Sequence, residues 1–258
     1  MSLFLAGCPL WLGSFLLVIL PTAAAMCGIV LVRHWIGFEH LRSNNEVAGF
    51  KFATVGVIYA VLLAFAVIIA WERFSDAESA VVHEAGSAAT LYRLVGGPEP
   101  EASETRAALA NYLKLAVAQD WPRMAAKQES REANAALNAL YASALRLAQS
   151  GGRPAPVVAQ VFNQLDGITQ ARRSRLQLAL GIVPTMVWGV LIVGALLTVG
   201  FTFFFGTPNL AAQVMMTGIL SIIVFMGLYV IVSLDHPFTG PVHVESEPLQ
   251  AVLADLGS

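Results

Sequence analysis

The chain has 258 residues and a formal net charge of −2, with 57% apolar and only 12% charged residues. A typical soluble domain carries about 25% charged residues, so this composition excludes an ordinary soluble protein. The small net charge supplies no basic surface of the kind that binds nucleic acid, and we expect no nucleic-acid partner.

Four stretches are long and apolar enough to cross a membrane, which takes roughly 20 residues. They run about Leu10–Val32, Phe50–Trp71, Leu178–Phe204 and Ala211–Leu234. The short connection between the last two contains glycine, proline and asparagine, which predicts a tight hairpin.

Between the second and third spans lies a charged, alanine-rich region with good helix formers. We therefore expect an all-α integral membrane protein with four transmembrane helices in two hairpins flanking a helical bundle soluble domain. The expected parts are a hairpin (1–71), the soluble domain (72–177), a second hairpin (178–234) and a C-terminal tail (235–258).

The soluble domain is predicted to hold four helices packed as a bundle. Pro122 is expected to open the third helix, and Pro156 a fourth that runs on into the third span. The first helix continues the second span, because apolar residues recur there at steps of three or four. These residues are Phe74, Ala77, Val81, Ala85, Ala88, Leu91 and Val95.

Catalytic signatures are missing from the sequence: it has no Walker loop, dinucleotide fingerprint, paired CxxC motif or nucleophile elbow. No carboxylate or histidine lies inside a predicted span, whereas proton relays and ion-coupled carriers use such residues. We expect no enzyme, no cofactor and no ion-coupled pump. A passive pathway needs none of these groups.

Small residues form a stripe along the second span, at Gly49, Ala53, Gly56 and Ala60. Their spacing places them on one helical face, where another helix backbone can approach closely. The stripe packs either inside the protomer or against another subunit around a central axis. In the second case these residues line or border a pore.

Gln213, Thr217 and Ser221 lie at four-residue steps on one face of the fourth span. A polar stripe in a charge-free helix is a candidate pore lining. The alternative is that the hydroxyls bond back to their own helix and Gln213 lies at the membrane interface.

Acidic residues follow the second span at Glu72, Asp76 and Glu84. Repeated around a symmetric oligomer they would form carboxylate rings, which concentrate cations. They would also suit a divalent metal ion, or simply form a solvated face. Asn45 and Glu46 are pore-mouth candidates at the other end of the span, or helix caps.

The arginines Arg172, Arg173 and Arg175 precede the third span, and we interpret them as anchors for lipid headgroups. They favour a cytoplasmic soluble domain with both termini on the same side, whereas Arg33, Arg42 and Lys51 after the first span favour the opposite orientation. Asp120 is expected to cap a helix, and Trp121 to anchor packing.

A turn follows the fourth span, where Asp235, Pro237, Phe238 and Gly240 form a structural tail motif. An Asp–His pair at 235 and 236 is a weak metal candidate, and no metal is assigned.

The segment from Asn45 to Leu94 resembles the bestrophin-like family of bacterial membrane proteins, and the tail from Leu234 to Gly240 resembles that family's signature. The residues that carry the first resemblance are Asn45, Gly49, Tyr59, Leu63, Phe65, Trp71, Ala77, Glu84, Ala85, Leu91, Tyr92 and Arg93.

The resemblance implies a relation to bestrophins, which are oligomeric chloride channels with a helical cytosolic domain. In bestrophins a Pro-Phe-Gly turn follows the last span; here Thr239 precedes the glycine. Calcium-responsive members carry an acidic run after that turn, whereas this chain has only Glu245 and Glu247, so calcium gating is not implied. The aromatic neck of bestrophins is not assigned among Phe50, Phe52 and Phe65.

We therefore expect a homo-oligomeric ion channel of the bacterial inner membrane, with four or five subunits and passive conduction of inorganic ions. The alternative is a non-conducting membrane scaffold or sensor whose soluble bundle binds a partner. Ion selectivity is open, because the resemblance suggests anions and the acidic residues suit cations.

Overall fold

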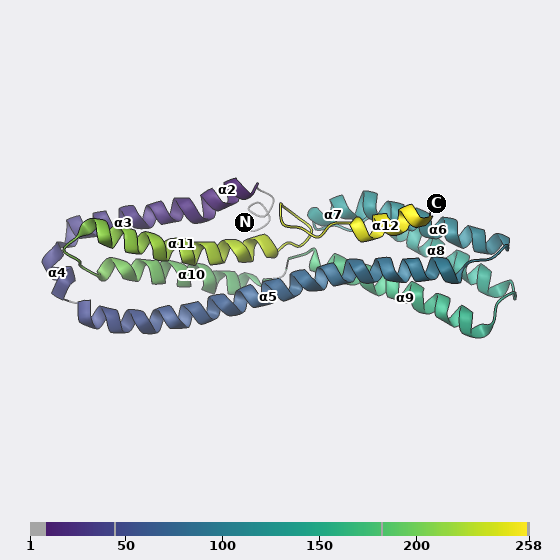
Figure 1. Ribbon diagram of the computed structural model, residues 1–258, viewed down its shortest axis with the longest axis horizontal. Helices are drawn as coiled ribbons and strands as arrows, with labels where there is room; N and C mark the ends of the chain where they lie inside the picture. Colours follow the sequence, from purple (N-terminus) through teal and green to yellow (C-terminus); the bar gives the residue numbers. More distant parts are fainter. Residues whose placement is uncertain (1–8, 44, 182, 257–258) are drawn as a thin grey trace. The chain divides into compact units, whose positions relative to one another are not determined.

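The computed structural model describes residues 9–43, 45–181 and 183–256, and within these ranges it consists of helices and their connections (Figure 1). The chain divides into two compact units. One unit, the membrane unit, contains Met1–Glu72, Ile182–Asp235 and Gly240–Val242; the other, the soluble unit, contains Arg73–Gly181, His236–Thr239 and His243–Ser258.

Four helical segments of the described chain are long and apolar enough to cross a membrane, which confirms the predicted fold class. The membrane unit contains α2 (Leu10–Ser14), a π-helical turn (Phe15–Ile19), α3 (Leu20–Ile36), α4 (Phe38–Ser43), α5 (Asn45–Leu94) as far as Glu72, α10 (Thr185–Phe201), a 3-10 turn (Thr202–Phe204) and α11 (Leu210–Leu234).

Close helix packing in the membrane unit depends on glycines. A Cβ added at Gly28 would lie 2.8 Å from the ring of Phe203, and one added at Gly218 would lie 3.1 Å from the sulfur of Met26. Burial of apolar surface does not drive spans together in lipid, because lipid tails are apolar as well. Small residues let the helix backbones approach closely, and the resulting van der Waals packing stabilises their association.

The soluble unit is a helical bundle with one apolar core. It is built from the remainder of α5, α6 (Pro100–Leu115), a π-helical turn (Ala116–Asp120), α7 (Trp121–Ala125), α8 (Arg131–Gln149), α9 (Ala155–Leu178) and α12 (Glu247–Leu256). The predicted apolar face is confirmed: Ala77, Val81, Ala85, Ala88 and Leu91 of α5 are buried, as is Val95 just after the helix, and Phe74 is half-buried.

Two expectations about helix ends were wrong. Pro122 lies in the first turn of the five-residue helix α7, which continues the π-helical turn Ala116–Asp120 without a break; the long helix expected to start there begins instead at Arg131, with Ser130 as its cap. Proline removes one backbone hydrogen bond, and a wider π turn just before it accommodates that loss. Pro21 stands in the same position after the π-helical turn Phe15–Ile19.

The second wrong expectation is that the fourth soluble helix runs on into the third span. Helix α9 ends at Leu178 and α10 begins at Thr185. Gly181 lies between them with φ +101°, a conformation that L residues rarely adopt, and Pro184 caps the new helix. Gly181 and Pro184 therefore cause the break between α9 and α10.

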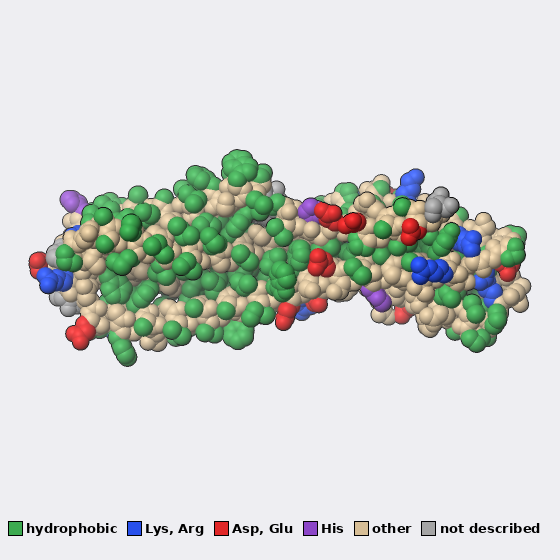
Figure 2. Space-filling model, in the orientation of Figure 1, with side chains coloured by type: hydrophobic (Ala, Val, Ile, Leu, Met, Phe, Trp, Pro, Cys, Tyr) green, Lys and Arg blue, Asp and Glu red, His purple; other side chains and the backbone are tan. Residues whose placement is uncertain are grey.

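Side-chain types follow the two units. Figure 2 shows hydrophobic side chains covering the visible face of the membrane unit, while most of the Lys, Arg, Asp and Glu side chains lie on the soluble unit or at the turn between α3 and α5. The large exposed residues of the membrane unit include Trp11, Trp35, Phe50 and Met186. Such a surface is stable only in contact with lipid or another subunit.

Candidate functional site on helix α5

Helix α5 is the least covered of the four spans. Only 11% of its most apolar stretch is buried, against 22%, 28% and 39% for the others. Its buried side chains in the membrane unit form one narrow face, which includes Tyr59, Ala66 and Ala70. The opposite face is open along the whole span.

The open side of α5 continues beyond the membrane unit, because exposed residues recur at steps of three or four along the same helix. We call this set the free face. It comprises Phe50, Thr54, Val57, Val61, Phe65, Ile68, Glu72, Ser75, Ser79, Val82 and Gly86, all of which are exposed.

Chemistry changes along the free face. Its first part is aromatic and aliphatic apart from Thr54, with Phe50 81% exposed and Phe65 61% exposed. From Glu72 onward it is polar or small apart from Val82, which is 59% exposed. A helix with such a face can line a passage that narrows at apolar side chains and widens at polar ones.

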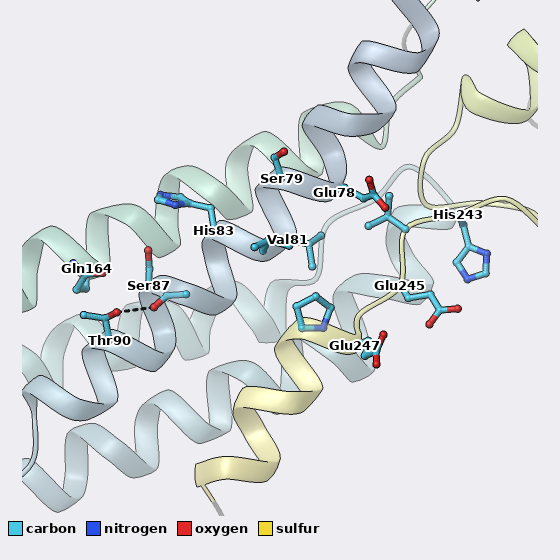
Figure 3. Close-up of a pocket in the computed structure, with 14 residues that line it drawn as sticks. Glu78, Ser79, Val81, His83, Ser87, Thr90, Gln164, His243, Glu245 and Glu247 are labelled. Atoms are coloured by element: carbon cyan, nitrogen blue, oxygen red, sulfur yellow. Dashed lines mark hydrogen bonds between the residues drawn. The ribbon is translucent and has the colours of Figure 1, made fainter.

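In the soluble unit the free face forms the floor of a groove of about 1160 Å³. Gln164 of α9 borders one side and the segment from His243 to Pro248 the other (Figure 3). The carboxylates Glu78, Glu245 and Glu247 line the groove, and among its described lining residues there is no Lys or Arg.

The acidic lining makes the groove a site of negative potential that attracts cations. It does not form a metal site by itself: across residues 9–43, 45–181 and 183–256 no three His, Cys, Asp or Glu side chains are grouped closely enough to hold a metal ion.

The predicted small-residue stripe lies next to the free face, one residue earlier in the sequence at each step. Ala53 and Ala60 are exposed, and Gly49 and Gly56 are half-buried. A Cβ added at Gly56 would meet nothing within 4 Å, and one at Gly49 would meet only Phe205, at 3.9 Å. The stripe is therefore not packed tightly inside the protomer.

The predicted stripe on α11 lies elsewhere. Gln213, Thr217 and Ser221 are 3%, 3% and 0% exposed, so they face the interior of the membrane unit and not a surface that subunits can share. Gln213 donates a hydrogen bond to the carbonyl of Phe205, and Thr217 donates one to the hydroxyl of Thr202 over 3.3 Å. Periodicity placed these residues on one face but gave no information on what covers that face.

The pore-mouth candidates separate into two groups. Glu46, Glu72 and Asp76 are exposed, and Asp76 pairs loosely with Arg73 at 3.8 Å. Asn45 is tied to the loop before α11: its amide donates to the carbonyl of Gly206 at 2.7 Å and accepts from the Gly206 N–H at 2.9 Å. Asn45 thus fastens the two hairpins together at that end.

Glu84 is not at a pore mouth, which corrects that assignment. It is fully buried in the soluble unit, where Arg175 donates to its two oxygens over 2.8 and 3.1 Å and Tyr112 donates to it as well. Burial, together with the Glu84 carboxylate, raises the pKa of Tyr112 well above its ordinary value. In the sequence, Glu84 looks like one more member of the acidic stretch after the second span, but it lies on the buried face of α5.

Two of the three predicted headgroup anchors are core residues as well. Arg172 is 4% exposed and donates to Asp120 over 2.9 Å, and Arg175 reaches the same carboxylate at 3.4 Å. Asp120 does not cap its helix; its other partner is the backbone N–H of Ser130. The π-helical turn that ends at Asp120 directs this side chain inward.

Trp121 and the tail fit together within the soluble unit. The ring of Phe238 meets Trp121 edge-on at 5.9 Å, and the Trp121 indole donates to the carbonyl of Val244 over 3.3 Å. The turn closes through a 2.7 Å bond from Val244 N–H to the Pro237 carbonyl, and Gly240 adopts φ +87°.

Asp235 ends the membrane unit. It is buried, and its carboxylate accepts the N–H of Val183 at 2.8 Å. It thus satisfies a backbone donor just before α10.

Sequence reasoning missed the large residues of the free face. An apolar position on a span is compatible with lipid, core or passage, so hydrophobicity does not separate them. The sequence did contain one signal for this face. The steps of three or four that join Phe65 and Ile68 continue into the polar residues Glu72, Ser75 and Ser79 beyond the span. A face that only contacts lipid has no reason to continue outside the membrane.

Comparison with known proteins gives a consistent family and fold. The model of the Bestrophin-like domain matches residues 19–249. No curated protein matches the chain.

Solved structures of low sequence identity share the fold. A point variant of a bacterial bestrophin homologue from Klebsiella pneumoniae is 16% identical, with a TM-score of 0.74 over 95% of this chain and 99% of that one. Another structure of the Klebsiella pneumoniae homologue is 17% identical, with a TM-score of 0.68 over 92% and 97%. A structure described as a membrane protein gives 0.73 at 16% identity, over 92% and 97%.

Proposed function

The chain belongs to the bestrophin-like family, and from this premise we propose that it forms a homo-oligomeric ion channel in which the free face of α5 lines a central passage. In this proposal the channel lies in the bacterial inner membrane. The soluble unit and both termini are cytoplasmic, and ions move passively.

The free face is the observation that carries the proposal. Lipid alone would account for exposed Phe50, Val57 and Val61 in the span, but it has no access to Ser75, Ser79 and Gly86 in the soluble unit. A helix that faces a shared axis is left uncovered in both places. Cyclic oligomers create such an axis, because each subunit presents the same face to it.

The small-residue stripe supports the same arrangement. Gly49, Ala53, Gly56 and Ala60 flank the free face, where the neighbouring subunit would pack if the free face points to the axis. Small residues allow the close backbone approach that such contacts between spans require.

Two features of the chain point to different ion selectivities. The resemblance to bestrophins suggests anions, whereas Glu72, Asp76 and the carboxylates of the groove favour cations. Fixed negative charges beside a narrow passage raise the local cation concentration and repel anions. The charge pattern of this chain favours cations.

The first test is ion flux from liposomes that contain the purified protein, under a salt gradient, with reversal potentials measured in planar bilayers. We expect a passive current. A reversal potential near the cation equilibrium value would establish cation preference, and one near the anion value would assign the acidic residues another role.

A second candidate function is a membrane sensor or scaffold, favoured by the size of the acidic groove in the soluble unit. Such a protein would conduct nothing across a range of pH, voltage and calcium, and its groove would bind a partner with basic residues. The absence of flux from correctly assembled protein would therefore exclude the channel in favour of this alternative.

Subunit number is measured separately, by native mass spectrometry in detergent. We propose four or five copies. A monomer would leave the free face of α5 without an axis and would contradict the proposed passage.

A further inference from the structure

Three hydroxyl groups inside the membrane unit are buried without a hydrogen-bond partner. Thr22 of α3, Thr198 of α10 and Ser221 of α11 are 5%, 3% and 0% exposed. The hydroxyl oxygen of each has no partner among the described residues. In a membrane span an unpaired polar group is costly, because no lipid atom can replace the lost water.

Helix register places the three hydroxyls in one layer. Thr202 contacts Thr217, so one turn further along the antiparallel pair α10 and α11 Thr198 comes opposite Ser221. On the same face of α11 as Ser221, Gly218 meets Met26 of α3, and one turn along the antiparallel pair α3 and α11 Thr22 comes opposite Ser221 and Ile222.

Each hydroxyl lies three residues from a small buried side chain on its own helix. Ala25 stands beside Thr22, Ala195 beside Thr198 and Gly218 beside Ser221. Residues at this spacing are neighbours on a helix surface. The layer therefore combines polar groups with small side chains, of which Gly218 is covered by Met26.

Back-bonding to the same helix is the usual solution for such residues, and the protein uses it elsewhere. Thr202 donates to the carbonyl of Val199 at 2.6 Å, and Thr105 donates to that of Glu101 at 2.8 Å. Thr22, Thr198 and Ser221 do not.

We infer that this layer is a water-binding site inside each protomer, in which water molecules bridge the hydroxyls of Thr22, Thr198 and Ser221. Buried water typically makes about three hydrogen bonds to otherwise unsatisfied polar groups, and three hydroxyls in one layer supply them. The site is separate from the free face of α5. It does not depend on whether α5 lines a passage.

Water-edited solid-state NMR on the full-length protein in bilayers tests the site. Threonine is labelled with ¹³C, and the signals of Thr22 and Thr198 are assigned by their loss in Thr22→Val and Thr198→Val. We expect magnetisation from water to reach both side chains. Thr105 is the control, since it is fully buried and bonded to its own helix, and it should receive none.

Transfer to Thr22 and Thr198 as weak as that to Thr105 would overturn the inference, since it would show hydroxyls bonded to their own helices in a dry layer. The variant Ser221→Ala tests whether the water is shared. Loss of transfer at Thr22 and Thr198 supports one shared site, and unchanged transfer at both overturns it.

Discussion

At the scale of single residues, the most consequential cluster is the ionic core of the soluble unit. Glu84 and Asp120 face Arg172 and Arg175, all within the buried interior, and Arg175 also stacks on Trp121 at 4.6 Å. An intact buried ion pair stabilises the fold little more than apolar residues of the same volume would. Removing one partner is expensive, because it leaves a buried charge unpaired.

The variant Arg175→Met is therefore expected to lower the free energy of unfolding by about 3–5 kcal/mol, the usual cost of breaking a buried pair. The measurement is unfolding in detergent, followed by circular dichroism. Arg173→Met is the matched control: Arg173 is exposed beside the same cluster, and its loss should change stability by less than about 0.5 kcal/mol.

Combining Glu84→Gln with Arg175→Met completes a double-mutant cycle. The double variant should lose less stability than the sum of the single variants, because neither charge is then stranded. Additive losses would show that the two side chains do not interact as the 2.8 Å contact implies.

Tyr112 gives the same cluster a pH dependence. Burial raises its pKa above its ordinary value near 10, so the folded protein holds the phenol proton more tightly than the unfolded chain. The resulting stabilisation is complete below pH 10 and is lost as pH rises further. In Tyr112→Phe the decline in stability above pH 10 should be shallower; an identical decline would place its origin at other groups.

At the scale of elements, α5 has two faces with different tasks. Phe52 packs inside the protomer, with ring centroids 5.8 Å from Phe201 and 5.6 Å from Phe205. Phe50 and Phe65 lie on the free face and point away from the interior of the protomer. The aromatic side chains that would border the proposed passage are therefore Phe50 and Phe65, whereas Phe52 lies inside the protomer.

Phe65→Ala is expected to raise the current through the proposed channel severalfold, because a smaller side chain weakens an apolar constriction that excludes water. Phe52→Ala should instead lower stability by about 2–4 kcal/mol, through lost packing, with little gain in current per assembled channel. Planar-bilayer recordings and thermal unfolding separate the two effects. Equal currents in wild type and Phe65→Ala would remove Phe65 from the passage.

At the scale of the whole molecule, charge is segregated from the spans. The charged residues of α5 begin again at Glu72, where the apolar part of the free face ends. In a symmetric assembly Glu72 and Asp76 would repeat as rings, and their effect on ions would be multiplied by the number of subunits.

The double variant Glu72→Gln and Asp76→Asn is expected to shift the reversal potential toward that of the anion, and to leave folding unchanged because both side chains are exposed. Glu101→Gln, on α6, is a control that should not shift it. A reversal potential that stays at the wild-type value would remove Glu72 and Asp76 from the conduction path.

Much of the architecture was determined by the sequence alone. Long charge-free stretches have one stable environment, so the four spans and their hairpins were predictable from composition. The 3.6-residue period of Ala77, Val81 and Ala85 likewise showed which face of α5 enters the soluble core. The tail turn was predictable from its prolines and glycine.

Only the tertiary structure decided which polar residues are inside. Glu84, Arg172 and Arg175 look like surface charges in the sequence, because the partners that make their burial tolerable are far away along the chain. For the same reason the polar stripe of α11 resembled a pore lining until its covering helices were seen. Local pattern determines the face a residue occupies, whereas contacts between distant segments determine what that face meets.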